Sequence, residues 1–444
     1  MDNTGAGLVP EKKRDERLKR WVAGSGINFR SAKARKVYQE RAARIKDALL
    51  IREPDRVPVM LPIGNFPLYH YGGNLKEGMY NYTFLRRAWI KFIREFYDDM
   101  DFFQSPGLVY SGTMLEILNY RLYKWPGHGL RDHFNSHQYV EGEYMKADEY
   151  DALLKDPGDF TMRTFIPRVS EALEPLQKLP PFMYLLDSPL RIVSPFTMPE
   201  VRAAVKALSD AGKEMASWQK SVMSVNRHSM EAGFPVTSGG MTTAPFDTIG
   251  DSLRGTQGIM MDMYRQPEKL LEAIDMITGI TIEQTISMVE NSAGFTVSFP
   301  LHKGDDSFMS DKQFEKFYWP SLKKVIDALI REGIMVLLFA EGRFNRRLEY
   351  IKDFPKGWVT WHFDQTDMTD AKKIVGKTCC MMGNVPSSVM CTGTAGDVKE
   401  WCRKLIETCA PGGGYILSSG ARATEAKPEN FRAMMEAALE YGIY

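Results

Sequence analysis

The chain has 444 residues, of which 44% are hydrophobic and 25% are charged, and its formal net charge is +1. This composition is ordinary for a globular protein, and so small a net charge excludes a global electrostatic attraction to nucleic acid or anionic membranes. No apolar run is long enough to span a bilayer, and the first twenty residues lack the apolar core of a secretory signal. These features predict a cytoplasmic protein.

Residues 1–50 are predicted to form an N-terminal arm and a helix. Residues 1–30 are polar and carry a basic cluster between Lys12 and Arg20, which is typical of a solvated face. From Ser31 to Leu50 the apolar residues are spaced for one face of a helix. We expect this region to be a helical extension of the main domain.

Residues 51–444 contain eight strand-like segments that alternate with helical ones. The segments are 57–61, 101–106, 234–240, 294–302, 334–340, 358–363, 379–385 and 414–420. Buried strands separated by helices predict a parallel α/β sheet, and eight such units predict a (β/α)₈ barrel, or TIM barrel. Residues 137–145 alternate like one arm of a hairpin outside this sheet. An open doubly wound sheet is the alternative, but no Gly-x-Gly-x-x-Gly motif follows a strand.

The candidate site residues are those that directly follow the predicted strands, because barrel chemistry lies at the carboxyl ends of the strands. Glu341 follows the apolar run Val336–Ala340, where an unpaired carboxylate would be costly. We expect Glu341, His302 and Asp306 to be catalytic. Four further strand-end residues are expected to contact the substrate: Asn65, Phe66, Met241 and Asn384.

All five cysteines lie in the last fifth of the chain, and none belongs to a Cys-x-x-Cys pair. Their odd number and their spacing argue against a disulfide framework and against a structural zinc knuckle. We expect buried free thiols. They are Cys379, Cys380, Cys391, Cys402 and Cys409.

Four motifs carry a family resemblance: KWPGHGL (124–130), QYVEGEYMKADEYDALLKDP (138–157), GNVPSSVMCTGTAGDV (383–398) and APGGGYILSSG with KPENFRAMMEAALEYG (410–442). From about Ala42 onwards the chain resembles the uroporphyrinogen decarboxylase superfamily. The resemblance implies the (β/α)₈ barrel and one of two chemistries. One is cofactor-free decarboxylation of a porphyrinogen, and the other is methyl transfer to or from a corrinoid (cobalamin) protein, usually assisted by zinc.

Two departures from the superfamily patterns narrow this choice. Its decarboxylases carry an Arg-rich segment after the first strand, whereas residues 61–74 here contain no Arg or Lys. Its thiol-activating methyltransferases carry His-x-Cys-Gly after the fifth strand and Cys after the eighth. Here the matching residues are 339–342 (Phe-Ala-Glu-Gly) and Ala421, so a Cys-rich zinc site is not supported.

Glu341 and His362, with twenty residues between them, resemble part of the zinc pattern of ether-cleaving methyltransferases from anaerobic O-demethylase systems. The first Glu of that pattern falls on Ile326, so a third ligand would come from His302, Asp305 or Asp306. We expect Asp305. The alternatives are that Glu341 pairs with a nearby arginine and that His362 is a satisfied core histidine.

We therefore predict a corrinoid-dependent methyltransferase of the O-demethylase type. It would move a methyl group from a small donor, preferably a methoxylated aromatic, to the Co(I) corrinoid of a partner protein. Phenolate is a poor leaving group, so a Lewis acid or a general acid at the ether oxygen lowers the cost of cleavage. A decarboxylase and a docking module for a corrinoid protein are the rivals. We expect no nucleic-acid or membrane partner, and a homodimer stays open.

Overall fold

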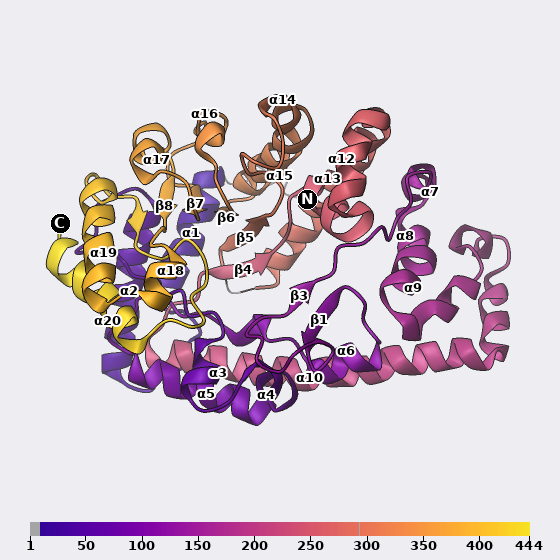
Figure 1. The fold of residues 1–444 in the computed structure, drawn as a ribbon, viewed down its shortest axis with the longest axis horizontal. Helices are drawn as coiled ribbons and strands as arrows, with labels where there is room; N and C mark the ends of the chain where they lie inside the picture. Colours follow the sequence, from indigo (N-terminus) through magenta and orange to yellow (C-terminus); the bar gives the residue numbers. More distant parts are fainter. Residues whose placement is uncertain (1–8, 293) are drawn as a thin grey trace, which may run out of the picture.

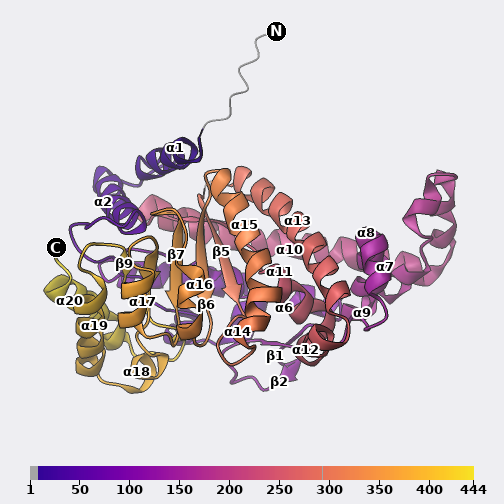
Figure 2. The ribbon, with the colours of Figure 1, turned by 90° about the horizontal axis from the view of Figure 1, so that it is seen from above.

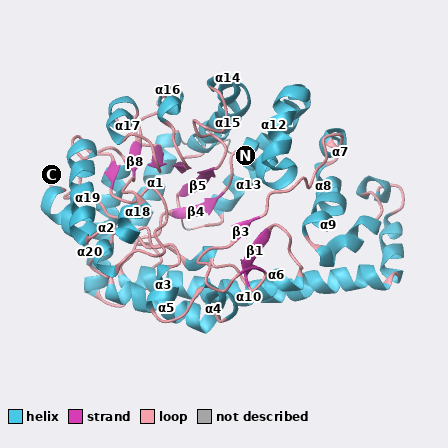
Figure 3. Ribbon diagram, in the orientation of Figure 1, coloured by secondary structure: helices cyan, strands magenta, loops and turns pink. Residues whose placement is uncertain are grey.

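The computed structural model describes residues 9–292 and 294–444. Its main sheet has six parallel strands in the order β4-β5-β6-β7-β8-β9 (Figures 1 and 3). The strands are β4 (Ser238–Met241), β5 (Thr296–Leu301), β6 (Met335–Ala340), β7 (Val359–Phe363), β8 (Cys380–Met382) and β9 (Tyr415–Ile416). Each lies within or at the edge of a predicted strand segment, so the α/β class with a parallel sheet is confirmed.

The first two predicted strands are not regular strands, and the barrel is not closed. Val59 pairs in parallel with Leu417 through a single bridge, and the amide of Asp101 donates to the carbonyl of Val59 over 2.9 Å. Pro58 and Pro62 lack amide hydrogens, which shortens any ladder at this segment. Within the described ranges, no backbone hydrogen bond joins residues 101–106 to β4. The prediction of eight regular strands was therefore wrong for these two segments.

Helices cover one face of the sheet and connect its strands (Figures 1 and 3). The connecting helices include α13 (Pro267–Glu290), α15 (Trp319–Arg331), α17 (Met368–Ile374) and α19 (Ala395–Cys409), and α20 (Pro428–Tyr441) packs on α19. Further helices are α3 (Phe66–His70), α4 (Leu75–Tyr80), α5 (Tyr82–Glu95), α6 (Gly112–Ile117), α12 (Gly255–Arg265), α14 (Asp311–Gln313), α16 (Leu348–Ile351) and α18 (Ser387–Thr392). No helix in residues 9–292 and 294–444 combines the length and apolar character needed to cross a bilayer.

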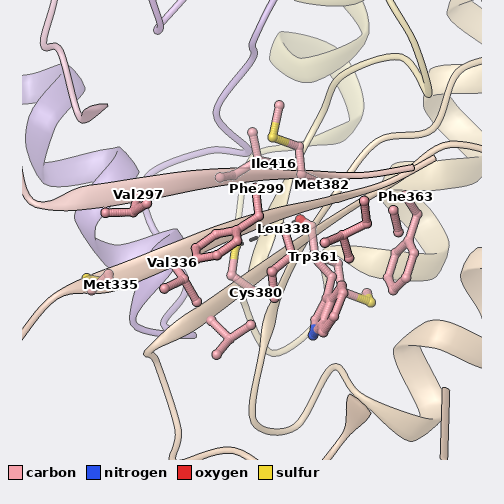
Figure 4. Packing of buried hydrophobic residues seen from close by; sticks show 14 of the residues in the cluster. Val297, Phe299, Met335, Val336, Leu338, Trp361, Phe363, Cys380, Met382 and Ile416 are labelled. Carbon is pink, nitrogen blue, oxygen red and sulfur yellow. Dashed lines mark hydrogen bonds between the residues drawn. The ribbon is translucent and has the colours of Figure 1, made fainter. Parts of the chain in front are cut away.

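The core lies between the sheet and these helices. Phe299, Leu338 and Trp361 stand in register on neighbouring strands, and all three are buried (Figure 4). Successive side chains of a strand point to opposite faces. The next residues, Phe339 and His362, therefore lie on the opposite face, where both are only partly buried.

The helix α1 (Pro10–Val22) lies across the amino ends of four strands. The indole of Trp21 donates to the carbonyl of Val236, just before β4, and its ring packs against Phe295, just before β5. The Lys13 ammonium lies 2.8 Å from the carboxylate of Glu332, before β6, and Arg14 lies 4.5 Å from the ring of Trp358, before β7. The predicted basic cluster thus belongs to a docked helix.

The helix predicted for residues 31–50 is α2 (Ala32–Leu49), and it begins at Ser31, whose side chain accepts the amide of Ala34. Residues 1–8 of the predicted arm lie outside the described residues.

Residues 106–232 form an excursion between the second strand segment and β4. A small sheet comes first, with β1 (Tyr123–Pro126) next to β2 (Gly129–Leu130) and antiparallel to β3 (Gln138–Tyr139). Of the hairpin arm predicted for residues 137–145, only Gln138 and Tyr139 form a strand. The elements α7 (Tyr150–Lys155), α8 (Pro157–Phe160), α9 (Ile166–Val169) and η3 (Glu171–Lys178) follow, and then the long α10 (Pro199–Ala232). Residues 157–208, here called the arm, project from one end of the molecule (Figures 1 and 2).

Candidate active site

The strand register brings His302 and Glu341 together at the carboxyl ends of β5 and β6. Leu301 stands opposite Ala340, so the next residue of each strand, His302 and Glu341, reaches the same level. The Nε2 atom of His302 lies 3.9 Å from Oε1 of Glu341. Asp364 follows β7 at the corresponding position. The two residues that we predicted to be catalytic on neighbouring strands therefore share one site.

A third carboxylate fixes the ring of His302. Its Nδ1 atom lies 2.6 Å from Oδ2 of Asp251, which belongs to the helical segment η6 (Thr248–Arg254) after β4. Burial alone would lower the pKa of His302, but the hydrogen bond and the charge of Asp251 outweigh burial and raise the pKa to about 9. At neutral pH His302 is therefore an imidazolium, with Nδ1–H donated to Asp251 and Nε2–H on the side of Glu341.

Asp247 holds the backbone that carries His302. This fully buried carboxylate ends α11 (Pro245–Asp247) and accepts the amides of His302 over 3.0 Å and Lys303 over 3.2 Å. It also accepts the hydroxyl of Tyr318 over 2.8 Å. Burial and the neighbouring Asp251 raise the pKa of Asp247. Residues four apart on a helical segment share one face, so Asp247 and Asp251 both reach the end of β5.

A buried lysine keeps Asp251 ionised. The ammonium of Lys303 lies 2.9 Å from Oδ1 of Asp251 and 2.8 Å from Oε1 of Glu141. Burial raises the pKa of Asp251, but His302 and Lys303 together lower it below its ordinary value. Asp251 therefore stays charged and can hold the imidazolium in place.

Glu341 does not form the arginine pair that was the alternative explanation for it. Arg346 and Arg347 both bind Asp311, and Arg347 also donates to the carbonyls of Gly304 and Met309. Burial raises the pKa of Glu341, and the charges of His302 and Arg422 oppose this shift. The nearest charged partner of Glu341 in the described part of the chain is thus His302.

The side chains of Glu141, Asp247, Asp251, His302, Lys303 and Glu341 are here called the charged group. An aromatic cluster lies beside it. Tyr110 and Tyr123 stack with ring centroids 5.3 Å apart, and the ring of His137 meets both edge-on. Tyr139 packs against Tyr123 and donates its hydroxyl to the carbonyl of Asp251 over 3.1 Å. The charge of Arg422 acts on Glu341, on Tyr110 and on His137, so Arg422 lies near both groups. The site therefore combines flat apolar surface with a proton donor.

The three residues predicted to bind zinc are not brought together. His362 stands opposite Phe339, two residues before Glu341, so it lies about 6–7 Å deeper along the sheet. Its Nε2 atom lies 2.8 Å from the carbonyl oxygen of Ser419, and burial lowers its pKa to about 4. Asp305 instead accepts the amides of Ser307 and Phe308, which caps a turn.

This geometry does not fit a site with three metal ligands. Among residues 9–292 and 294–444, no group of three or more His, Cys, Asp or Glu side chains is placed to hold a metal ion. The expected set of Glu341, His362 and Asp305 is thus not assembled in this structure, and His362 instead makes a hydrogen bond within the sheet.

Asp306 and Asn384 support loops rather than the charged group. The Asp306 carboxylate accepts the amide of Arg346 and lies 3.8 Å from the guanidinium of Arg347. The amide nitrogen of the Asn384 side chain donates to the carbonyl of Thr366 over 2.7 Å. The expected catalytic role of Asp306 therefore finds no support in its contacts.

The remaining predicted contact residues are dispersed. The side chain of Asn65 donates to the carbonyl of Asn135 over 2.9 Å, and Met241 is exposed at the end of β4. Phe66 is buried against Phe92 and Phe431, so it is a core residue and cannot reach a substrate without rearrangement. A polar cleft of about 560 Å³ opens next to Glu341, and it is lined by Asp305, Asp306, Ser307, Gly342, Arg343, Asn345, Arg346 and Gln365.

Comparison with known proteins places this site in a family. A family model described as uroporphyrinogen decarboxylase (URO-D) matches residues 190–441, which is more than half of the 444 residues. The chain belongs to the uroporphyrinogen decarboxylase family. The match covers β4 to β9, and thus every residue of the charged group except Glu141.

The similarity of this family member to curated relatives is low. Uroporphyrinogen decarboxylase from Sodalis glossinidius is 23% identical over 184 residues, which are 40% of this chain and 50% of that protein. The protein of the same name from Danio rerio is 23% identical over 258 residues, which are 55% of this chain and 67% of that protein. The chain spans about half the length of the first of these relatives.

One solved structure resembles nearly the whole of this family member. A methyltransferase from Methanosarcina mazei superposes with a TM-score of 0.57 at 16% identity, covering 91% of this chain and 98% of that chain. At this identity the likeness concerns the fold.

Sequence reasoning missed Asp247, Asp251 and Lys303 in this member of the uroporphyrinogen decarboxylase family. We looked only at residues next to strand ends, whereas both aspartates lie in the helical segment that follows β4. Their spacing in FDTIGD was the available signal, because two acids four apart in a helix share one face. Lys303 directly follows His302 at the end of β5, and this position was the available signal for it.

Proposed function

We propose that this protein is a methyltransferase that moves a methyl group from a small methylated donor, preferably a methoxylated aromatic, to the Co(I) corrinoid of a partner protein. One observation carries the proposal: a charged histidine, held by Asp251 and facing Glu341, lies beside an aromatic cluster at the strand ends. The fold shared with a methyltransferase from Methanosarcina mazei supports the same class.

The charged histidine supplies the proton that cleavage of an aryl ether requires. The methyl carbon–oxygen bond breaks, and a carbon–cobalt bond forms with the electron pair of Co(I), which leaves the ether oxygen as a phenolate. At 3.9 Å from Glu341, the Nε2–H of His302 makes no direct hydrogen bond to that carboxylate and can donate to the phenolate oxygen instead. The product is then the neutral phenol.

Asp251 and Asp247 position this acid. Asp251 orients the ring and favours its charged form, and Asp247 anchors the backbone of His302. The stacked tyrosines Tyr110 and Tyr123 provide a surface suited to a flat aromatic donor.

The chain itself offers no strong nucleophile at this place, which supports an external methyl acceptor. All five cysteines are free, and Cys379, Cys380, Cys402 and Cys409 are buried. Burial raises the pKa of each of these four thiols, so they remain protonated at neutral pH. None of them follows β5 or β6, where the acid lies.

Activation by zinc was our expectation for the ether oxygen, and the described residues do not fit it. The ligand trio is not assembled, so the proposal assigns activation to the proton of His302. Elemental analysis of active protein tests this assignment. One tightly bound zinc per chain, together with loss of activity on its removal, would contradict the general-acid proposal.

A decarboxylase is the second candidate, because the family description and the curated relatives carry that name. A porphyrinogen with several carboxylates needs several counter-charges. Residues 61–74 contain no Arg or Lys, and Phe66 within this segment is buried in the core. This observation favours methyl transfer.

The decisive experiment follows the absorbance of Co(I) corrinoid protein mixed with the enzyme and a panel of methoxyarenes and methylamines. We expect the Co(I) band to disappear with methoxyarenes, and an equal amount of phenol to form. His302→Gln should slow this change strongly with methoxyarenes whose phenols are weakly acidic, and His228→Gln, on α10, is the matched control that should not. Reaction with an amine but with no ether would keep the class and overturn the donor. Reaction with neither would overturn the methyltransferase.

A further inference from the structure

Glu141 is the one member of the charged group that lies outside residues 190–441, the range that the family model matches. It belongs to the excursion, and the segment 137–145 around it also carries His137 and Tyr139 of the aromatic cluster. The surface that suits a flat donor thus comes from the excursion, whereas His302 comes from the sheet. The proposed reaction needs these two parts of the chain to be held together.

Both carboxylate oxygens of Glu141 are bound by groups outside the excursion. Oε1 lies 2.8 Å from Nζ of Lys303, and Oε2 accepts the amide of Thr256 over 3.0 Å. The ammonium of Lys303 also donates to Oγ1 of Thr256 over 3.1 Å. Burial raises the pKa of Glu141, but its hydrogen bonds with Lys303 and Thr256 outweigh burial and lower the pKa. Glu141 is therefore ionised at neutral pH.

A chain of charged contacts leads from Glu141 to His302. The ammonium of Lys303 lies between two carboxylates, 2.8 Å from Glu141 and 2.9 Å from Asp251. The other oxygen of Asp251 lies 2.6 Å from Nδ1 of His302. Only 4% of the Lys303 side chain is exposed, so solvent screens these charges little. A change at Glu141 is therefore felt at His302.

Polar contacts carry much of the hold on the segment 137–145. A cleft of about 940 Å³ lies between this segment and α12, and Glu141 and Glu143 are among its lining residues. An open cleft provides few packing contacts, so ion pairs at its rim matter more. Glu143 binds Arg254 over 2.5 Å, and Glu141 binds Lys303. Of these two ion pairs, only the second joins the segment to the acid.

We propose that Glu141 is a positioning residue for the proposed methyl transfer, on which this inference rests: it ties the donor surface of the excursion to His302 through Lys303 and Asp251. With Glu141 in place, Lys303 is shared between two carboxylates, and Asp251 is left to hold the imidazolium. Without Glu141, Lys303 binds Asp251 alone and competes with His302 for that carboxylate. The acid is then fully charged only while the excursion is seated against the sheet.

Titration of the seven histidine rings by nuclear magnetic resonance tests this link in the full chain. The variant His302→Gln identifies the signal of His302 by its loss. In Glu141→Gln the competition from Lys303 disfavours the imidazolium, so the proton affinity of His302 should fall about three- to tenfold. The other groups that face His302 are unchanged in this variant: Asp247, Asp251, Lys303 and Glu341.

Glu143→Gln is the matched control. It removes the same charge two residues further along the same segment, where the carboxylate binds Arg254 and its side chain is 56% exposed. The proton affinity of His302 should then change less than about twofold, because solvent screens this charge. Far-UV circular dichroism confirms that each variant is folded. An unchanged His302 in Glu141→Gln, or an equal fall in Glu143→Gln, would overturn the proposal.

A second background tests the route through Lys303. In Lys303→Met, the further change Glu141→Gln should alter the proton affinity of His302 less than about twofold. A full effect in this background would show that Glu141 acts directly on His302 and would overturn the route.

The titration does not depend on methyl transfer, so the two proposals can fail separately. If the unmodified chain demethylates nothing, the proposed function is wrong, while the titration still decides the link between Glu141 and His302. In active enzyme, Glu141→Gln should move the alkaline limb of the pH–rate profile by the same factor as the titration. A limb that stays in place while the titration moves would overturn the role of Glu141 in the reaction.

Discussion

The Nδ1 atom of His302 lies 2.6 Å from Oδ2 of Asp251, although the two residues are 51 positions apart in the chain. The contact joins the end of β5 to the helical segment that follows the neighbouring strand β4. It fixes the imidazole in one orientation and keeps it charged, which is what a general acid at neutral pH requires.

The pH dependence of activity should report this contact. His302 must be protonated to act, and its pKa is about 9, so we expect activity to fall as the pH rises through about 9. In Asp251→Asn the main cause of the raised pKa is gone while burial remains. The alkaline limb should then move to lower pH, because only the charges of Asp247 and Glu341 still oppose burial. A pH–rate profile of each form measures the shift, and an unchanged limb in Asp251→Asn would mean that another group sets it.

The same raised pKa makes a contribution to folding stability whose sign is defined. The pKa of His302 is higher in the folded than in the unfolded chain, so its contribution is complete below pH 6.5 and is lost as the pH rises through about 9. Thermal unfolding at pH 6 and pH 9.5 should therefore differ less for His302→Gln than for the unmodified chain. An equal difference in both would show that other groups dominate.

The need for the acid should depend on the leaving group. When the phenol is strongly acidic, its phenolate leaves readily and needs little protonation. When the phenol is weakly acidic, its leaving oxygen depends much more on a proton from the acid. We expect His302→Gln to slow transfer from poor donors by about 10² to 10⁴ and to slow the best donors much less. Rates for methoxyarenes with graded ring substituents test this. A uniform loss across the series would indicate a role in binding or folding instead.

Asp247 should matter for stability as much as for activity. Its carboxylate accepts two amides and one hydroxyl in a fully buried place, and an asparagine would turn an NH₂ group toward at least one of these donors. We expect Asp247→Asn to lower the free energy of unfolding by about 2–4 kcal/mol. Asp275→Asn, at an exposed ion pair with Lys324, is the control and should change it by less than about 1 kcal/mol. Urea unfolding measures both.

Uroporphyrinogen should not be a substrate. With no Arg or Lys in residues 61–74, the carboxylates of this porphyrinogen lack counter-charges after the first strand segment. We expect no release of carbon dioxide under conditions in which a known uroporphyrinogen decarboxylase is active. Measurable release that Glu341→Gln or His302→Gln abolishes would instead establish the decarboxylase.

Most strands of the sheet could be predicted because they contain a largely apolar run, as in Met335–Ala340, whereas β4 (Ser238–Met241) lies only at the end of its predicted segment. Residues 57–61 show the same composition, but their prolines limit the ladder to a single bridge with Leu417. The segment at 101–106 begins with Asp101, whose carboxylate binds Arg44, Arg56 and the amide of Val59. Side-chain bonding there replaces regular strand pairing, and residue type alone does not reveal it.

The candidate site could be predicted only as far as the strand ends. Glu341 and His302 were found because each directly follows an apolar run. The pairing of Glu341 with His362 failed because it depends on register, and a shift of two residues moves a side chain one level along the sheet. Asp251 was missed because it lies in a helical segment ten residues after β4, and only its four-residue spacing from Asp247 indicates a shared face.

The placement of α1 has a consequence for how the molecule moves. Its contacts before β4, β5, β6 and β7 tie four strand starts to one rigid rod, so none of them can fray independently of the others. Local opening then concentrates at the far ends of the same strands, where His302 and Glu341 lie and where reactants must come and go. Because α1 holds the amino ends of these strands together, the sheet opens more readily at their carboxyl ends.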